Sequence, residues 1–167
     1  VIGNPPYIHI EKIRQEEKKY YLNKYGKEGK LGKRYDLYQV FILVAIVGIL
    51  KERGKLSYIL PNTFLMGKSY SILRERMYNF ARAFQIVDLP QRVFENATVD
   101  NVLLFLSLES DINHIIINKL QTKGDYRKIN EHKWDSTFTL CYRELAPPMY
   151  EINVHADPIK KKIISMI

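Results

Sequence analysis

The chain has 167 residues, a single cysteine (Cys141), 46% hydrophobic residues and a formal net charge of +8. This composition excludes a disordered tail and a disulfide framework, and it favours a folded domain in a reducing, cytoplasmic setting. The longest uncharged apolar run, Val40 to Leu50, is shorter than the roughly 20 residues of a membrane span, so we expect no membrane partner. The basic balance favours anionic partners such as nucleic acid.

Strand-like and helix-like segments alternate along the first 120 residues. Val1 to Gly3 reads as the end of a buried strand, and residues 11–34 read as a polar helix-plus-loop excursion. Asp36 is expected to cap an apolar helix that runs to about Arg53, with Gly54 as its C-cap. The remaining predictions are strands over 55–60, 84–89, 101–108 and 114–120 and a helix over 69–83. This alternation predicts an α/β fold.

The pattern weakens beyond Gln121. Residues 126–157 mix charged and aromatic side chains with Pro147-Pro148, so we expect residues 121–167 to form a linker. A terminal helix is expected to open at Asp157-Pro158.

The segment with the clearest chemistry is Asn4-Pro5-Pro6-Tyr7, directly after the first strand end. Two prolines fix the backbone and remove its donors, which leaves carbonyl oxygens free to accept hydrogen bonds. Asn4 adds a side-chain carbonyl and Tyr7 a flat aromatic face. At the carboxyl end of a strand these groups suit a planar ligand with an exocyclic amine. The alternative is a proline-rich turn with a buried tyrosine.

This segment resembles the (Asp/Asn/Ser)-Pro-Pro-(Tyr/Phe/Trp) motif of amino-methyltransferases. The segments around Tyr35-Asp36-Leu37-Tyr38, Gly54 to Asn62, Leu73-Arg74, Ile86 to Leu89 and Val93 to Leu106 extend the resemblance to adenine-specific DNA methyltransferases of the TaqI and type IIG restriction–modification kind. The resemblance implies that residues 1–120 are the C-terminal half of a Rossmann-like catalytic domain, with a partial, mostly parallel sheet and flanking helices. Residues 121–167 would lead toward a target-recognition domain.

The resemblance also implies the chemistry of the intact parent. S-adenosylmethionine would be the methyl donor, and double-stranded DNA with a flipped adenine the substrate. Asn4 and the Pro5 carbonyl would accept hydrogen bonds from the adenine amine, Tyr7 would stack on the base, and Phe94 would contact the base from another side. Phe41 would line the cofactor, with core packing as its alternative.

The glycine-rich loop and the acidic residue that hold this cofactor in the family are not found in the chain. We therefore expect the chain alone to bind S-adenosylmethionine weakly and to be inactive without an N-terminal half. The four histidines, His9, His114, His132 and His155, lack metal-ligand spacing, so no metal site is predicted. An open edge at Val1 to Gly3 predicts self-association of the chain.

Two other functions stay open. Asn-Pro-Pro-Tyr also occurs in enzymes that methylate a glutamine amide of a protein release factor, although the segments around Asp36 and Phe94 resemble the DNA enzymes more closely. The chain could instead be a non-catalytic basic module that binds nucleic acid.

Overall fold

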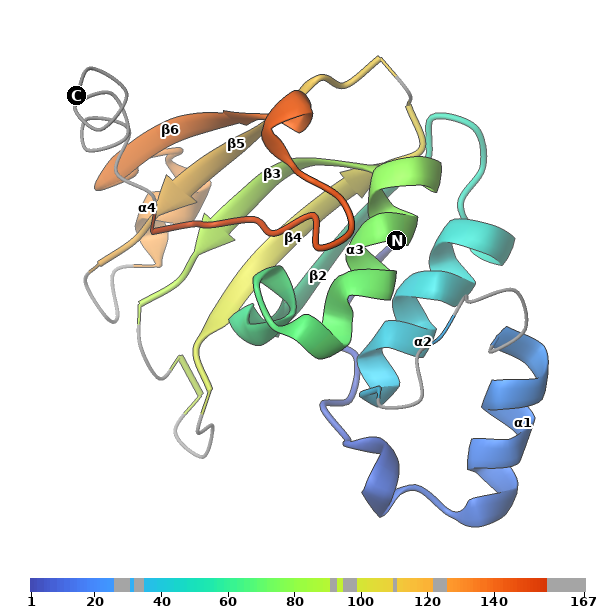
Figure 1. Ribbon diagram of the computed structural model, residues 1–167. Coiled ribbons are helices and arrows are strands. Elements are labelled where there is room, and N and C mark those ends of the chain that lie inside the picture. The colour runs from blue at the N-terminus through green and yellow to red at the C-terminus, as the bar shows by residue number, and fades with distance from the viewer. Residues whose placement is uncertain are drawn as a thin grey trace.

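The computed structural model describes residues 1–25, 31, 35–90, 93–94, 99–109, 111–121 and 126–155. Within them, six strands form one sheet in the order β1-β2-β4-β3-β5-β6 (Figure 1). The strands are β1 (Ile2–Gly3), β2 (Lys55–Pro61), β3 (Arg82–Asp88), β4 (Asn101–Ser107), β5 (His114–Lys119) and β6 (Ser136–Cys141). The α-helices are α1 (Gln15–Tyr25), α2 (Leu37–Val44), α3 (Ser71–Phe80) and α4 (Arg127–Asn130).

The strand directions bring the chemically interesting segments to one edge of the sheet. β1 runs parallel to β2, and β4 runs antiparallel to both β2 and β3. The carboxyl ends of β1, β2 and β3 therefore meet at the same edge, together with the amino end of β4. The turn after β1, the turn after β2 and the loop after β3 all leave the sheet there.

The α/β class with flanking helices is confirmed, but the sheet is mixed instead of mostly parallel. Only β1–β2 and β3–β5 pair in parallel, whereas β4 is antiparallel to its two neighbours and β6 is antiparallel to β5. A parallel pair needs a long crossover, usually a helix. β4 returns directly beside β3, and β6 beside β5, without a crossover helix of that length in the described residues.

The apolar helix after Asp36 ends earlier than its sequence predicts. α2 continues as a π-helical turn over Ala45–Ile49, and Leu50 already has extended backbone. Ala45 and Ile46 of this turn are buried, whereas the side chains of Val47 and Ile49 are 67% and 54% exposed. The apolar helical segment is therefore not covered on every side. Gly54 is not its C-cap. It closes a tight turn in which a Cβ atom would lie 2.7 Å from the Lys51 carbonyl oxygen.

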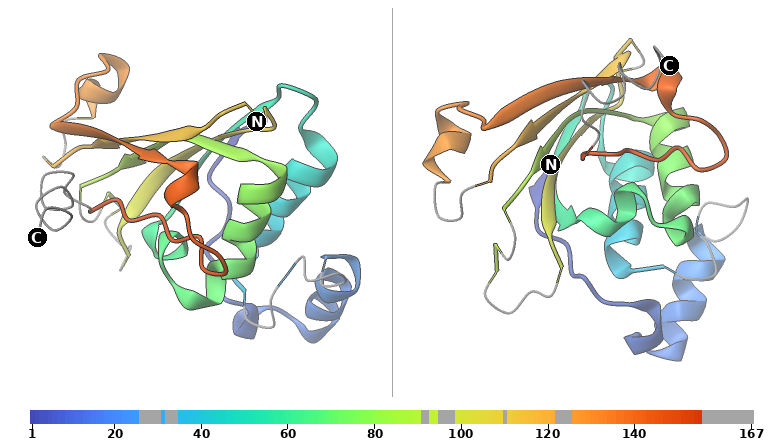
Figure 2. Two further views of the ribbon diagram at one scale, coloured as in Figure 1. Left: turned by 45° about the horizontal axis from the view of Figure 1, so that its top comes forward. Right: turned by 60° about the vertical axis from the view of Figure 1, so that its left-hand side comes forward.

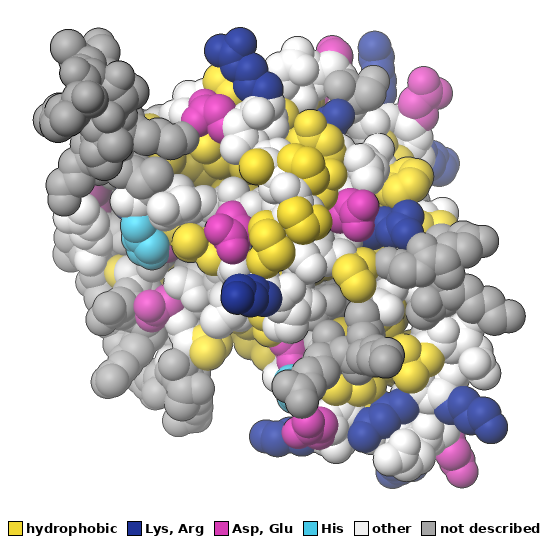
Figure 3. All heavy atoms as spheres, viewed as in Figure 1, with side chains coloured by type: hydrophobic (Ala, Val, Ile, Leu, Met, Phe, Trp, Pro, Cys, Tyr) yellow, Lys and Arg dark blue, Asp and Glu magenta, His cyan; other side chains and the backbone are white. Residues whose placement is uncertain are grey.

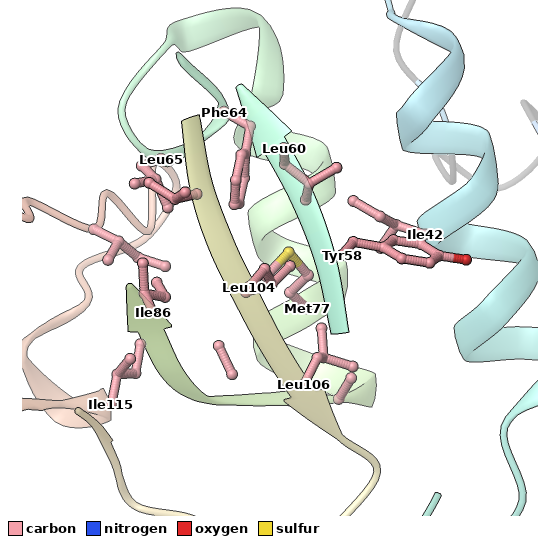
Figure 4. Packing of buried hydrophobic residues seen from close by; sticks show 14 of the residues in the cluster. Ile42, Tyr58, Leu60, Phe64, Leu65, Met77, Ile86, Leu104, Leu106 and Ile115 are labelled. Atoms are coloured by element: carbon pink, nitrogen blue, oxygen red, sulfur yellow. The ribbon is translucent and has the colours of Figure 1, made fainter. Parts of the chain in front are cut away.

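Helices α2 and α3 lie on the same face of the sheet, and the main core fills the space between them and the strands (Figure 2). Figure 4 shows how side chains from β2, β3, β4 and α3 meet there. Leu104, Leu106 and Ile86 from the strands are completely buried, and Met77 of α3 is 3% exposed. β4 is apolar from Val102 to Leu106 because one of its faces is buried in the main core and the other is partly covered by a further hydrophobic cluster.

Residues 126–155, which the sequence places in a linker, pair with the sheet and pack on the main core. β6 pairs with β5 along six residues. After β6 the chain crosses back over the helical face, where the Tyr142 hydroxyl donates to the Ala83 carbonyl at 3.0 Å and Ile152 and Val154 are buried in the main core. The sequence signal of this stretch is weak because its strand, β6, is short and many of its residues are polar. The helix expected at Asp157-Pro158 lies outside the described residues.

β1 is an edge strand with one neighbour among the described residues. It pairs only with β2, and Ile2 is 90% exposed. The self-association expected from this edge stays a prediction.

Candidate active site

The turn after β1 offers free hydrogen-bond acceptors at the carboxyl edge of the sheet. Gly3 pairs with Tyr58, and a Cβ atom at Gly3 would lie 3.0 Å from the Tyr58 ring, so the strand end packs closely on β2. Asn4 follows and is exposed, whereas Pro5 is buried. Within the described part of the chain, the Asn4 side chain and the Pro5 carbonyl make no hydrogen bond. Neither oxygen is therefore occupied by a donor from that part of the chain.

Tyr7 is held in place at the end of this turn. Its hydroxyl donates to the Ile59 carbonyl at 2.8 Å and accepts a longer hydrogen bond of 3.5 Å from the Asn101 side chain. The ring meets Tyr38 of α2 edge to face, with 6.1 Å between centroids. Burial raises the pKa of Tyr7 to about 12, although the Asn101 hydrogen bond opposes this shift. Tyr7 is therefore a neutral, anchored and half-buried ring.

Asn101 is a site residue that the sequence reasoning missed. It is the first residue of β4 and completely buried, and its side-chain amide donates to Tyr7 while its side-chain oxygen has no partner among the described residues. A buried polar group normally finds hydrogen bonds for all its atoms, so an unpaired oxygen at this edge is unusual. The available signal was a polar residue directly before the apolar run Val102 to Leu106.

Asp36 contributes to an aromatic row beside the motif. It occupies the N-cap position of α2 but makes no side-chain capping bond, so the predicted cap is wrong in its chemistry. Instead, its carboxylate accepts from the Tyr70 hydroxyl at 2.6 Å, and Tyr70 stacks on Tyr38 with 6.2 Å between centroids. The row Tyr7–Tyr38–Tyr70 therefore links the motif to the turn that precedes α3.

The turn after β2 is closed by a buried arginine. Arg74 of α3 is 2% exposed and donates to the carbonyls of Phe64 and Gly67 at 2.7 and 2.8 Å and to the Met149 carbonyl at 2.7 Å. It ties the turn after β2 to the segment that follows β6. A cavity of about 300 Å³ lies between these two segments. Its lining includes Asn62, Thr63 and His155.

The end of β3 carries a carboxylate whose charge is disfavoured. Burial raises the pKa of Asp88, and the opposing charges of His155 and Lys119 offset this only in part. The imidazole of His155 lies 3.8 Å from the Asp88 carboxylate.

The two predicted aromatic contacts are exposed. Phe94 lies in the loop after β3 at 37% exposure, and Phe41 lies one helical turn beyond Tyr38 on α2 at 42% exposure. Neither side chain belongs to a hydrophobic cluster of the described residues, which argues against core packing of Phe41. Residues 91–92 and 95–98, which flank Val93 and Phe94, lie outside the described residues. The structure brings Asn4, Pro5, Pro6 and Tyr7 together with Asn101, and sets Phe94 on the loop from the same edge.

Metal ligands do not gather in the described residues: no group of three or more His, Cys, Asp or Glu side chains there could hold a metal ion. The described helices are also too short or too polar for any of them to pass through a bilayer.

The fold is that of restriction–modification methyltransferases. The methyltransferase subunit of a type I restriction–modification system from Streptococcus thermophilus matches 92% of this chain with a TM-score of 0.67 and 16% identity, over 36% of its own length. A nuclease-deletion mutant of the type ISP enzyme LlaGI, solved in complex with a DNA substrate mimic, matches 96% of the chain and 18% of its own length with a TM-score of 0.61 and 17% identity. The chain thus has part of a Rossmann-like methyltransferase fold.

Sequence similarity then defines the family. The Eco57I restriction-modification methylase model matches residues 1–94, more than half of the chain, so the chain belongs to this family. The type II restriction enzyme and methyltransferase RM.Eco57I of Escherichia coli is 33% identical over 117 residues, which are 68% of this chain and 11% of that protein. The chain spans about a tenth of the length of the curated relatives that it matches.

Proposed function

We propose that this chain is the carboxyl-side half of the catalytic domain of a site-specific DNA methyltransferase that methylates the exocyclic amine of adenine. The observation that carries the proposal is the turn after β1, where the Asn4 side chain and the Pro5 carbonyl have no donor among the described residues and lie beside an anchored tyrosine. Its partners would be the cofactor-binding half, a target-recognition domain and double-stranded DNA.

The acceptors explain how the amine would be activated. The lone pair of the adenine amine is delocalised into the ring, which makes it a poor nucleophile. Hydrogen bonds from its two N–H groups to Asn4 and to the Pro5 carbonyl would favour a tetrahedral nitrogen with a localised lone pair. The protein's contribution is positioning and electrostatics, without a covalent intermediate.

Adenine would have to leave the duplex to reach this edge, because its amine lies inside the base stack. Tyr7 suits a stacking role, since its hydroxyl is fixed to Ile59 and the ring is only half-buried. Stacking of a base on an aromatic side chain is worth about 1–3 kcal/mol. Phe94, exposed on the loop after β3, would contact the base from another side.

The proposed methyl donor is S-adenosylmethionine, which supplies an electrophilic methyl group when bound. Phe41 fits a contact with its adenine ring, because this apolar side chain is 42% exposed and lies one turn beyond Tyr38, which touches Tyr7. The groups that bind the rest of the donor would come from the upstream half. The chain alone is therefore expected to bind the donor weakly.

The test is product analysis with the full-length polypeptide that contains this chain. Incubated with DNA and a labelled donor, it should produce N6-methyladenine, detected by mass spectrometry of the digested nucleosides. Asn4→Ala should lower the rate about 10²- to 10³-fold, since one preorganised contact to the reacting group is lost. Because Asn4 is exposed and unbonded within the described residues, the melting temperature should stay unchanged.

Asn79→Ala, at an exposed asparagine on α3, is the matched control and should keep the wild-type rate. N4-methylcytosine as the product would contradict the adenine assignment. A methylated glutamine in a release factor would favour the protein-methylating alternative. DNA binding without any methylated product would favour a non-catalytic module.

A further inference from the structure

The segment between the motif and α2 leaves the domain and returns to its starting point. The Ile10 amide donates to the Tyr35 carbonyl at 3.0 Å, and the Leu37 amide donates to the Ile8 carbonyl at 2.8 Å. His9 and Asp36 form an isolated antiparallel bridge between these two bonds. We call residues 10–35 the excursion and the paired residues 8–10 and 35–37 its neck. The neck begins directly after Tyr7, so the excursion leaves the domain beside the candidate active site.

Helix α1 of the excursion uses one side for packing and exposes the rest. None of its residues is fully buried. Tyr21 and Tyr25 pack against a second hydrophobic cluster, which also contains Ile13, Tyr35 and Val40. A helix placed outside the main core in this way contributes little to the central sheet, which leaves its outer surface free for another role.

The exposed side of α1 combines lysines with aromatic rings. Tyr20 is 55% exposed, and Lys24 donates to its hydroxyl at 3.1 Å and lies over the rings of Tyr20 and Tyr25. The hydrogen bond with Tyr20 raises the pKa of Lys24, so this ammonium group stays charged. Lys19 is exposed one position before Tyr20.

The charges of α1 are separated along its axis. Glu16 and Glu17 occupy the first turn, and residues 18–25 contain three lysines and no acidic residue. In Figure 3 several Lys and Arg side chains gather over the part of the molecule where Figure 1 places α1. We call Lys18, Lys19, Tyr20 and Lys24 the α1 basic surface.

The geometry points to the α1 basic surface as a contact site for the phosphate backbone of the DNA duplex beside the flipped base. This inference rests on the proposed function, because it takes DNA as the substrate. Cationic side chains fixed near exposed aromatic rings are suited to phosphates and sugars, and they would position the duplex without reading its sequence. The short neck would keep this contact next to the turn after β1.

The test compares two charge-matched double variants of the full-length polypeptide. Lys19→Gln with Lys24→Gln removes two charges from the α1 basic surface. Lys51→Gln with Arg143→Gln removes two exposed charges at the opposite edge of the sheet, near the start of β2 and after the end of β6. The affinity for a DNA duplex is measured between about 50 and 200 mM salt, a range over which phosphate contacts make the affinity fall steeply.

The α1 variant should bind DNA on the order of tenfold more weakly, and its slope of log K against log salt should be smaller by about 2, since each phosphate contact contributes about 0.9. The control should match the wild type in both. Equal slopes for the two variants, with adenine methylation intact, would overturn this inference alone. A wild-type protein that forms no methyladenine would overturn the proposed function instead. Loss of binding to anionic vesicles but not to DNA would identify the surface as lipid-binding and also overturn it.

Discussion

The turns that follow β1 and β2 occupy neighbouring places at the same edge of the sheet, but they treat their backbone carbonyls in opposite ways. After β2, the carbonyls of Phe64 and Gly67 both accept hydrogen bonds from the buried Arg74. After β1, two prolines remove donors from the turn, and the Pro5 carbonyl has no partner among the described residues. In the described part of the chain, the Tyr7 hydroxyl is the one side-chain group that ties that turn to β2 by a hydrogen bond.

This difference suggests that, at the same edge of the sheet, the turn after β2 serves stability and the turn after β1 serves recognition. A saturated turn is held by the protein itself, and its paired carbonyls cannot accept from a ligand. An unsaturated turn leaves acceptors without protein donors, and its shape is set by proline rings and one hydroxyl anchor instead of by a donor that would occupy those acceptors. A variant that disturbs the turn after β2 should therefore affect folding, whereas a variant in the turn after β1 should affect chemistry.

The largest effect is expected from Arg74→Met. It leaves three buried or partly buried carbonyls without their donor, and each hydrogen bond to a charged group is worth about 1.5–3 kcal/mol. We expect the free energy of unfolding to fall by about 3 kcal/mol or more in a urea titration. Arg74→Lys should recover only part of the loss, because an ammonium group cannot reproduce the planar fork. Wild-type stability in Arg74→Met would remove the contrast between the two turns.

Tyr7 should show the opposite balance. Tyr7→Leu removes the ring and should lower the methylation rate by roughly 10- to 100-fold, in line with about 1–3 kcal/mol of stacking. Tyr7→Phe keeps the ring but loses the bond to Ile59, which should cost about 1 kcal/mol of stability and less than tenfold in rate. Initial rates and thermal melts of both variants give the comparison. A Phe variant as inactive as the Leu variant would mean that the anchor, and not the ring face, is essential.

β1 carries the unsaturated turn from an exposed edge, whereas β2 has strands on both sides. Ile2 is 90% exposed on that edge, and open edges invite pairing with another chain. Light scattering of the 167-residue chain should therefore detect dimers or larger species. Ile2→Lys should shift the chain toward monomer, because a charge on an edge strand opposes such pairing. A wild-type chain that is already monomeric at high concentration would contradict this expectation.

The smallest effect concerns the end of β3. Because burial raises the pKa of Asp88, the folded chain binds that proton more tightly than the unfolded chain does. The stability that this protonation contributes is therefore fully present below the ordinary carboxyl pKa of about 4, and it is lost as the pH rises through the raised pKa of Asp88. Asp88→Asn cannot lose a proton there, so its melting temperature should equal that of the wild type in acid and exceed it slightly at neutral pH. The same difference at every pH would show that the charge is not responsible.

Local sequence patterns predicted most of the strands and the position of the motif. β2, β4 and β5 lie within a residue or two of the segments expected from their apolar runs, since such runs bounded by turn residues are typical of buried strands. The motif was found because its chemistry resides in four consecutive residues. Helix α2 was predicted less well, because its apolar pattern continues past the π-helical turn at Ala45–Ile49.

The features that depend on distant residues could not be predicted in this way. Asn101 joins the site only because β4 returns beside β2, which places it 3.5 Å from a hydroxyl 94 positions earlier in the chain. Arg74 resembles any polar residue of an exposed helix until the segment around Met149 is laid over it. The mixed sheet follows from β4 and β6 returning beside their predecessors, and strand direction is not encoded in hydrophobic periodicity.

The closed neck of the excursion has a consequence for how such chains can change in length. Backbone hydrogen bonds between residues 8–10 and 35–37 fix the two ends next to each other, whatever lies between them. The entropy of closing a loop rises slowly with its length, by only about 0.6 kcal/mol for each doubling. Residues inserted or deleted within the excursion would therefore leave the turn at Asn4 to Tyr7 nearly undisturbed. Related proteins could acquire longer, shorter or differently charged versions of this segment while the chemistry beside it stays the same.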